Sequence, residues 1–323
     1  MFIEIGLLLV GFGILIKGAD FLVNGASSAA KKYGISNLAI GLTVVAFGTS
    51  MPELVVSFLS ALDGKNDASF GNVIGSNNFN LLFILGVAGL IYPLIVHRNT
   101  VKWEVPISLL AAVVLFVLVN DEMIMGGSVN ILSRFDSIIL LLFFGGFLWY
   151  IYRTMKTAPE TEEAPIKMYT TPVAVGLVIL GLAMLIGGGQ LVVSNAIVIA
   201  QHYGLSEKLI GLTILAAGTS LPELATSTVA AYRKNTDIAI GNVIGSNIFN
   251  IFFILGVTGV VTPIQYNVEM NFDFKILAAS TVVLMIFMFT LNTRKLDRWE
   301  AFLLLAAYIV YTVVLVNMDS SPV

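Results

Sequence analysis

The chain has 323 residues, of which 57% are hydrophobic and 11% are charged, and its mean hydropathy is +0.92. Soluble domains carry about 25% charged residues, so this composition identifies an integral membrane protein. There is no cysteine, which excludes disulfides, thiolate metal sites and thiol catalysis, and the net charge of −3 gives no indication of a nucleic-acid partner.

Apolar runs along the chain predict about ten membrane helices, because a span needs roughly 20 mostly apolar residues. The first, MFIEIGLLLVGFGILIKGAD, lacks the features of a signal peptide and is expected to stay in the mature protein. We expect the spans near residues 50, 80, 220 and 250 to be interrupted by Gly, Pro, Ser and Asn. The predicted span centres are near residues 12, 50, 80, 111, 142, 184, 220, 250, 282 and 307.

The fold class predicted from these runs is an all-α integral membrane protein. Residues 154–170 are the only long polar stretch, with two prolines and a cluster of glutamates. We expect them to form an acidic linker between two helical halves, residues 1–153 and 171–323.

Lysine and arginine are distributed unevenly between the predicted loops. One set of loops holds Lys65, Arg134, Lys208 and Lys275. The opposite set holds Lys31, Lys32, Arg98, Lys102, Arg153, Lys156, Lys167, Arg233, Lys234, Arg294, Lys295 and Arg298. Because cytoplasmic loops are rich in these residues, the second set predicts a cytoplasmic linker and extracellular termini.

A long sequence block occurs twice. Residues 41–87 contain GLTVVAFGTSMPEL and GNVIGSNNFNLLFILGV, and residues 211–257 repeat them, 170 positions later, as GLTILAAGTSLPEL and GNVIGSNIFNIFFILGV. Each half of the chain has about five predicted spans, so an odd number forces the second half into the opposite orientation. Inverted repeats of this kind form transporters with a binding site near the bilayer midplane.

Both copies carry a glutamate, Glu53 or Glu223, inside an apolar stretch. A charged side chain at the bilayer centre costs about 2.5–3.5 kcal/mol on insertion scales, so its presence in both copies indicates function. The proline before each glutamate breaks the helix, which we expect to free carbonyls around Ala46 and Ala216. Carbonyl, hydroxyl and carboxylate oxygens suit Ca²⁺, and Na⁺ accepts them too. These residues therefore predict a cation site built from two related halves.

A capping box is the alternative interpretation of this motif, because Ser50 and Ser220 each precede the glutamate by three positions. A cap contributes only about 1 kcal/mol, which is less than the cost of the charge. An uncharged glutamine would cap a helix more cheaply, so two glutamates favour the ion site.

The second part of the repeated block, residues 71–80 and 241–250, places polar side chains along one face of a membrane helix. Such side chains either bind a neighbouring helix or line an ion pathway. Asn72 and Asn242 are expected to hold helices together. Residues four positions apart share a helix face. The candidate ligands on these faces are Asn80 and Asn250, next to Ser76 and Ser246.

The doubled motif, GTS-[ML]-PEL followed by GN-VIGSN-x-FN, resembles the α-repeats of the cation/Ca²⁺ exchanger superfamily, in particular the prokaryotic sodium/calcium exchangers. The resemblance extends over nearly the whole chain. It implies that the first and sixth helices slide across the core as a gate, and that calcium, exchanged for sodium, binds Glu53 and Glu223. The further ligands it implies are Ser50, Ser220, Thr49, Thr219, Ser76, Ser246, Asn80, Asn250, Ala46 and Ala216.

Two positions depart from related branches of the superfamily. Asn250 stands where some relatives, including potassium-dependent ones, carry aspartate, which argues against potassium co-transport. Gly75 and Gly245 lie near the positions where the proton/calcium branch carries a glutamate, which argues against proton coupling.

The predicted function is secondary active antiport of sodium for calcium across the plasma membrane by alternating access. Ca²⁺ and Na⁺ are the expected substrates and the lipid bilayer the expected surroundings, with no cofactor, nucleic acid or obligatory protein partner. A proton/calcium antiporter and a cation channel remain open as alternatives. An enzyme is not expected, because the sequence has no Cys, no His/Asp constellation and no HExxH-type pair.

Charged groups outside the repeated motifs receive simpler predictions. Lys17 and Asp20 lie one turn apart in the first span, where an ion pair is expected and a gating role is the alternative. Gly187 and Gln190 replace them in the second copy. His97 is expected to be solvated, as is His202, because both lie near the edges of loops.

Overall fold

The computed structural model describes residues 2–126, 129–155, 167–203, 216–290 and 294–320. Within these ranges eight helices are long and apolar enough to span a membrane, and counting a bent helix pair as one span gives nine. The all-helical membrane fold is therefore confirmed. The predicted span near residue 220 overlaps residues 204–215, which lie outside the described ranges, as do residues 156–166 of the predicted linker.

The elements of the first half are α1 (Phe2–Tyr33), α2 (Asn37–Ile40), η1 (Gly41–Val45), α3 (Ala46–Thr49), α4 (Met51–Leu62), α5 (Asn66–Asn78), η2 (Phe79–Ile84), α6 (Leu85–Ile91), β1 (Leu94–Ile95), η3 (Thr100–Glu104), α7 (Val105–Val119), α8 (Asp121–Met125), β2 (Ile131–Leu132) and α9 (Arg134–Thr154). Those of the second half are α10 (Thr171–His202), α12 (Ala216–Thr219), α13 (Leu221–Tyr232), α14 (Thr236–Ile248), η5 (Phe249–Leu255), α15 (Gly256–Val261), β3 (Ile264–Gln265), η6 (Val268–Met270), α16 (Asn271–Phe287), β4 (Lys295–Leu296) and α17 (Arg298–Ser320). The bounds of α5 and α14 differ by the 170 positions that separate the repeated motifs.

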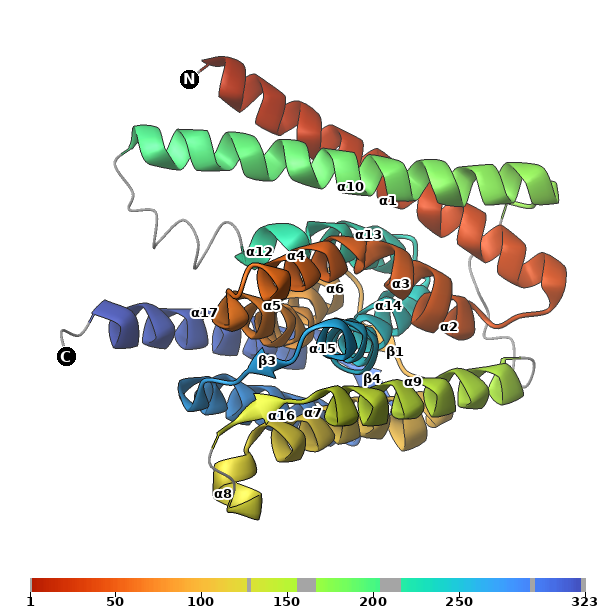
Figure 1. The fold of residues 1–323 in the computed structure, drawn as a ribbon. Helices are drawn as coiled ribbons and strands as arrows, with labels where there is room; N and C mark the ends of the chain where they lie inside the picture. Colours follow the sequence, from red (N-terminus) through yellow and green to blue (C-terminus); the bar gives the residue numbers. More distant parts are fainter. Residues whose placement is uncertain (1, 127–128, 156–166, 204–215, 291–293, 321–323) are drawn as a thin grey trace.

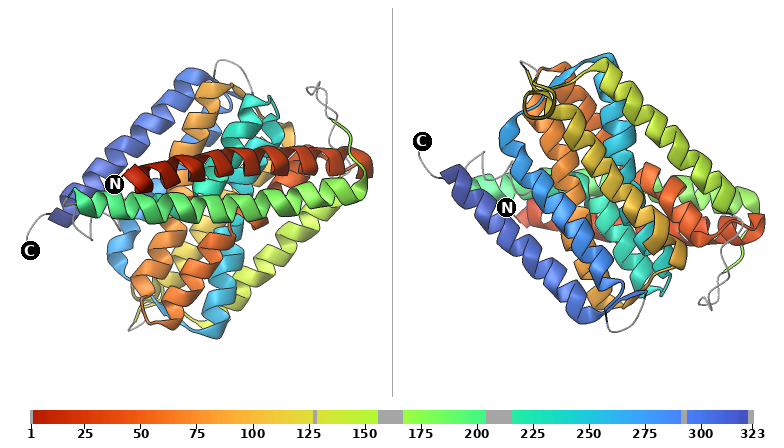
Figure 2. Two further views of the ribbon diagram at one scale, coloured as in Figure 1. Left: turned by 90° about the horizontal axis from the view of Figure 1, so that it is seen from above. Right: turned by 90° about the horizontal axis from the view of Figure 1, so that it is seen from below.

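Helices α1 and α10 lie side by side across one face of the helical core (Figures 1 and 2). Their backbones meet at glycines, Gly11 against Gly188 and Gly18 against Gly181. Residue numbers rise along α1 as they fall along α10, so the two helices are antiparallel. Small residues allow this close approach. A Cβ atom on Gly181 would lie only 2.6 Å from the backbone nitrogen of Leu22.

The core is built around two continuous helical spans, Asn66–Ile91 and Thr236–Val261, whose residues are mostly buried. The predicted interruptions of these spans are wrong, because neither contains a proline and the backbone donors can continue the helix. Each span instead changes to π-helical geometry, at η2 in the first copy and η5 in the second. Such turns are frequent at functional sites.

The predicted break at Pro52 is confirmed. The segments Asn37–Thr49 and Met51–Leu62 meet at a 47° bend, and Pro52 lies in the first turn of the second segment. Pro222 occupies the same position in the first turn of α13. Both repeats therefore present the end of one helix and the start of another in the buried core.

Two short antiparallel ribbons join the halves of the chain. Strand β1 pairs with β4, aligning Leu94 with Leu296, and β2 pairs with β3, aligning Ile131 with Gln265. In each ribbon one strand comes from the first half and the other from the second half. The ribbons therefore fasten the two repeats to each other outside the motif helices.

The expectation that His97 is solvated is wrong. Its side chain is only 14% exposed, and its Nε2 lies 2.9 Å from Oδ2 of Asp237 at the start of α14. The sequence could not predict this contact, because 140 positions separate the two residues. In contrast, the expected pair between Lys17 and Asp20 is confirmed, with 3.6 Å between Nζ and Oδ2.

Candidate cation site

Glu53 and Glu223 lie in the first turns of α4 and α13 and are both 0% exposed. The proline breaks put each carboxylate at a helix N-terminus, where unpaired backbone N–H groups and the helix dipole favour negative charge. The fold thus stabilises two acids in the core without placing an arginine or lysine against them among the described salt bridges.

Each glutamate is bonded by a serine from the other repeat. Ser50 Oγ donates to Glu223 Oε1 at 2.8 Å, and Ser220 Oγ donates to Glu53 Oε1 at 2.8 Å. Neither serine side chain caps the helix that it precedes. The capping box is therefore absent from this structure, and the serines join the two repeats instead.

A second pair of serines completes the bonding of these inner carboxylate oxygens. Ser76 Oγ lies 3.3 Å from Glu53 Oε1, and Ser246 Oγ lies 3.3 Å from Glu223 Oε1. Ser220 Oγ and Ser76 Oγ also lie 3.0 Å apart. The serines named as candidate ligands thus come together with the glutamates in one buried cluster.

The outer carboxylate oxygens are different. Oε2 of Glu53 and Oε2 of Glu223 are buried and have no hydrogen-bond partner among the residues that the structure describes. Buried polar atoms are nearly always paired, so an orphaned pair needs an explanation. No three His, Cys, Asp or Glu side chains in the described ranges cluster as they would for a resident transition metal. Two carboxylates among hydroxyl and amide oxygens suit a hard cation instead.

Four asparagines cross-link the central helices and orient two more free oxygens. Asn77 Nδ2 donates to the carbonyl of Asn247 at 3.2 Å, and Asn247 Nδ2 donates back to the carbonyl of Asn77 at 3.3 Å. Their own side-chain oxygens accept from Asn250 and Asn80, each at 2.9 Å. With their amide nitrogens held in this way, Asn80 and Asn250 keep Oδ1 buried and without a described partner. Asn77 and Asn247 are absent from the predicted ligands, although their recurrence at the repeat offset marks them.

Asn72 and Asn242 hold the broken helices in place, as predicted. Asn72 Nδ2 donates to the carbonyl of Glu53 at 3.2 Å and to Ser57 Oγ at 2.9 Å. Asn242 makes the same contacts with Glu223 and Ser227, at 3.3 and 3.0 Å. The candidate threonines approach these asparagines, Thr219 to Asn72 at 3.2 Å and Thr49 to Asn242 at 3.0 Å.

The expectation that the break frees the carbonyl of Ala46 is wrong. This oxygen accepts from Ser50 N at 3.0 Å and from Thr49 Oγ1 at 3.3 Å. The donor that Pro52 lacks would have reached Gly48, four residues earlier, so the break affects that carbonyl instead. Ala216 begins α12, and its side chain lies outside the described set.

Comparison with known proteins identifies relatives over nearly the full length. Residues 3–153 and 173–317 match the family described as sodium/calcium exchanger protein. The sodium/calcium exchanger MaX1 of Methanosarcina acetivorans is 32% identical, over 96% of this chain and 97% of the relative. The inner membrane protein YrbG of Escherichia coli is 36% identical, over 81% of each chain. A solved structure of the sodium-calcium exchanger NCX_Mj, soaked with 10 mM Na⁺ and 10 mM Sr²⁺, superimposes with a TM-score of 0.81 at 32% identity, covering 96% of this chain and 97% of that one.

Proposed function

Because the chain belongs to the sodium/calcium exchanger family, a family of transporters and not of enzymes, we propose that it exchanges sodium for calcium across the plasma membrane by alternating access. The single observation that carries this proposal is the pair of buried glutamates, each with one oxygen held by the opposite repeat and one oxygen unpartnered in the described structure. Members of this family carry Na⁺ and Ca²⁺ without a cofactor.

The proposed ligands are the oxygens of the buried cluster. Glu53 and Glu223 supply the charge, and Asn80 and Asn250 supply neutral oxygens that are also unpartnered in the described structure. The serines and threonines of the motifs, with the backbone at Ala216, complete the proposed set. The further ligands are Ser50, Ser220, Thr49, Thr219, Ser76 and Ser246.

Charge balance gives the coupling. Two nearby carboxylates carry a charge of about −2, which is unfavourable in a low-dielectric core unless cations neutralise them. One Ca²⁺ or two Na⁺ ions satisfy this condition, so the two ions compete for the same charged centre. If the gating helices slide across the core only when the site is neutralised, the fluxes of the two ions are coupled. An inward sodium gradient then drives calcium outward.

The proposed topology is about ten spans arranged as two inverted five-helix repeats, residues 1–153 and 171–323, joined by a cytoplasmic linker at 154–170. Antiparallel packing of α1 against α10, which begin the two halves, supports the inversion. The distribution of lysine and arginine supports extracellular termini.

The test is uptake of ⁴⁵Ca²⁺ into proteoliposomes loaded with sodium, compared with vesicles loaded with choline or with an imposed pH gradient. Uptake that requires internal sodium and saturates with calcium supports the proposal. Uptake driven by the pH gradient and indifferent to sodium would replace it with proton/calcium antiport. A non-saturating flux without counter-ion dependence would indicate a channel.

A further inference from the structure

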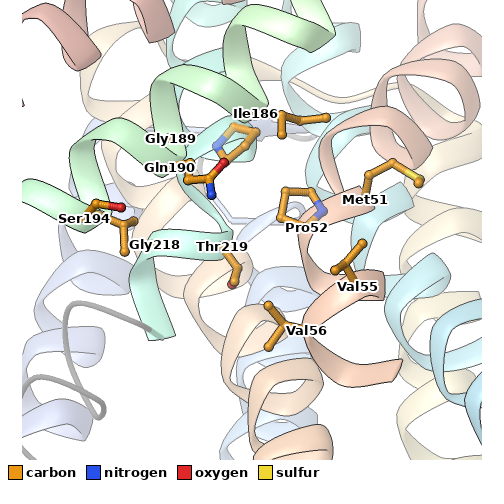
Figure 3. Close-up of a pocket in the computed structure, with 12 residues that line it drawn as sticks. Met51, Pro52, Val55, Val56, Ile186, Gly189, Gln190, Ser194, Gly218 and Thr219 are labelled. Atoms are coloured by element: carbon orange, nitrogen blue, oxygen red, sulfur yellow. The ribbon is translucent and has the colours of Figure 1, made fainter. Parts of the chain in front are cut away.

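Among the described residues, the two repeats differ where α10 and α1 cover the core: one of these helices borders an open pocket and the other does not. On the side of α10, a pocket of about 510 Å³ opens between α10 and α4 (Figure 3). Gln190 and Ser194 of α10 line it, and it reaches Thr219 beside the candidate cation site. We call this pocket the first entrance.

The equivalent region of the other repeat is closed. Positions 170 residues away from those of the first entrance are called mirror positions. Helix α1 packs along α13, and this contact replaces the pocket. Val55 and Val56, which line the first entrance, are exposed and partly exposed, whereas their mirrors, Ala225 and Thr226, are partly exposed and buried. We call the closed region between α1 and α13 the second entrance.

An arginine bridges the second entrance. Arg233, at the end of α13, donates through NH2 to Oδ1 of Asp20 and through NH1 to Oδ1 of Asn24, the latter at 2.5 Å. Asp20 and Asn24 are the mirrors of Gln190 and Ser194, the polar residues of the first entrance. The guanidinium group of Arg233 thus contacts the side-chain oxygens of Asp20 and Asn24. The residues at the mirror positions line the open pocket that leads towards the cation site.

The surrounding contacts support this arrangement. Asn235 Nδ2 donates to Ser27 Oγ at 3.0 Å, so the loop between α13 and α14 holds α1 over a second turn. Lys234 between them adopts φ of 61°, a left-handed conformation rarely taken by residues other than glycine. The other oxygen of Asp20 faces Lys17, at 3.6 Å. The structure accepts this backbone strain at the loop that carries the bridging arginine.

At the described mirror positions, the first entrance lacks the pair of charges that closes the second. The mirror of Arg233 is Asp63, which is 67% exposed and lies 3.8 Å from Lys65. The mirror of Asp20 is the neutral Gln190. An aspartate and a glutamine form no ion pair, so the mirror positions do not repeat the electrostatic contact between Arg233 and Asp20.

We propose that Asp20 and Asn24 form a cation-recruiting site at the second entrance, and that Arg233 occupies this site as a tethered cation that locks the entrance shut. When α1 separates from α13, Arg233 leaves and the two oxygens face the ions that approach the glutamates. The identity of those ions as Ca²⁺ and Na⁺ rests on the proposed function, whereas the lock does not.

Thiol labelling tests the lock without any transport measurement, because the chain has no cysteine and an introduced thiol is the only one. Thr226→Cys reports the second entrance and Val55→Cys reports the first. Arg233→Gln should raise labelling of Thr226→Cys by a water-soluble maleimide about two- to fivefold, the range expected for loss of a partly exposed ion pair, and lower that of Val55→Cys. Asp20→Asn should act equally, and the double variant should add nothing further. Unchanged labelling in both single variants would overturn the lock.

A gain-of-function variant supplies a second, independent test. Gln190→Arg places a guanidinium opposite Asp63 and should create a mirror lock, which lowers labelling of Val55→Cys. Adding Asp63→Asn keeps the new cation but removes its partner, and it should restore labelling. If labelling stays low in the Gln190→Arg/Asp63→Asn protein, the arginine blocks by bulk alone and the ion-pair explanation fails.

Comparing two variants that both remove the lock tests the cation-recruiting role of Asp20 separately from the lock. Arg233→Gln leaves the carboxylate at the second entrance, and Asp20→Asn does not. The KM for Ca²⁺ measured from that side should be about two- to fivefold lower in Arg233→Gln than in Asp20→Asn, with equal values from the first-entrance side. If the two variants have equal KM values for Ca²⁺ on the second-entrance side as well as on the first-entrance side, the recruiting site is overturned. Absence of calcium uptake by the unaltered protein would overturn the proposed function and leave the labelling result standing.

Discussion

Ser50 Oγ donates a hydrogen bond to Glu223 Oε1 at 2.8 Å, although the two residues are 173 positions apart and Glu53 lies in the next turn. The serine of one repeat therefore positions the carboxylate of the other. Because Ser220 and Glu53 make the same contact, each half of the chain supplies part of the hydrogen bonding of the other half's glutamate.

Replacing either serine should weaken cation binding to the same extent. A hydrogen bond to a charged group contributes about 1.5–3 kcal/mol, so Ser50→Ala and Ser220→Ala should each lower calcium affinity about 10- to 100-fold. Titration calorimetry measures the change. Ser280→Ala is the matched control, because that buried serine bonds only within its own helix. A loss confined to one of the two variants would contradict the symmetric arrangement.

Removing either carboxylate charge should abolish exchange. Glu53→Gln and Glu223→Gln keep the shape of the side chain but leave a single acid, which cannot neutralise Ca²⁺. We expect sodium-dependent ⁴⁵Ca²⁺ uptake to fall at least about 100-fold, while thermal unfolding occurs at an equal or higher temperature, since a buried charge is gone. Glu122→Gln, an exposed acid outside the site, should leave uptake unchanged. Normal uptake by both site variants would remove the ligand assignment.

Asn77 should matter for cation binding without touching the cation. Its side-chain oxygen accepts from Asn250, so Asn77→Ala frees that amide to rotate and should lower calcium affinity as much as Asn250→Ala does. The measurement is the rise in unfolding temperature on adding calcium, which reports affinity by mass action. A wild-type rise in Asn77→Ala, together with a reduced rise in Asn250→Ala, would show that the contact is dispensable.

The glycine seam between α1 and α10 gives a prediction about packing. A Cβ atom at Gly181 would lie 2.6 Å from Leu22 N and 2.7 Å from Gly18 O, so Gly181→Ala must push the helices apart and lower both stability and transport. Gly176, in the same helix, has nothing within 4 Å of that position. Gly176→Ala should therefore stabilise the protein by about 0.5–1 kcal/mol through helix propensity. Equal unfolding temperatures for the two variants would contradict close packing of α1 and α10 at Gly181.

Position 250 should determine dependence on potassium. The chain has asparagine there, so calcium uptake is expected to be the same whether potassium or choline is added outside. Asn250→Asp adds a third acid to the site, and the extra charge should require an additional cation to neutralise it. We expect uptake by this variant to rise with added potassium. Potassium-stimulated uptake by the unaltered protein would contradict the inference from Asn250.

The repeated motifs predict which residues meet in the core, because both copies keep the same polar residues at the same spacing. They do not predict how these residues pair. Within one motif Ser50 and Glu53 fit a capping box, and only the packing of α4 against the second repeat directs the serine to Glu223. The proline break follows from a local rule about backbone donors, so it could be read from the sequence. The same rule leaves the Ala46 carbonyl bonded, because the donor that Pro52 lacks would have reached Gly48, and Ser50 N still donates to Ala46.

The contacts of α1 with distant parts of the chain also could not be predicted from the sequence. Lys17 and Asp20 predict a local pair by their spacing, and the structure contains it. The bond between Asp20 and Arg233 spans 213 positions and depends on how α1 lies on α13. The contact of His97 with Asp237 could not be predicted for the same reason, since a loop position gives no information about a partner on α14.

The exchange of hydrogen bonds between repeats also has a consequence for biosynthesis. Glu53 leaves the ribosome 167 residues before Ser220, the hydroxyl that bonds it in the finished protein. During that interval the acid lies in a nascent helix without its partner from the second repeat, so the translocon must accept a span whose glutamate still lacks the hydrogen bond from Ser220. Synthesis of the start of α13 supplies Ser220 and Glu223 together, so both hydrogen bonds between the repeats become possible late in translation and at the same point.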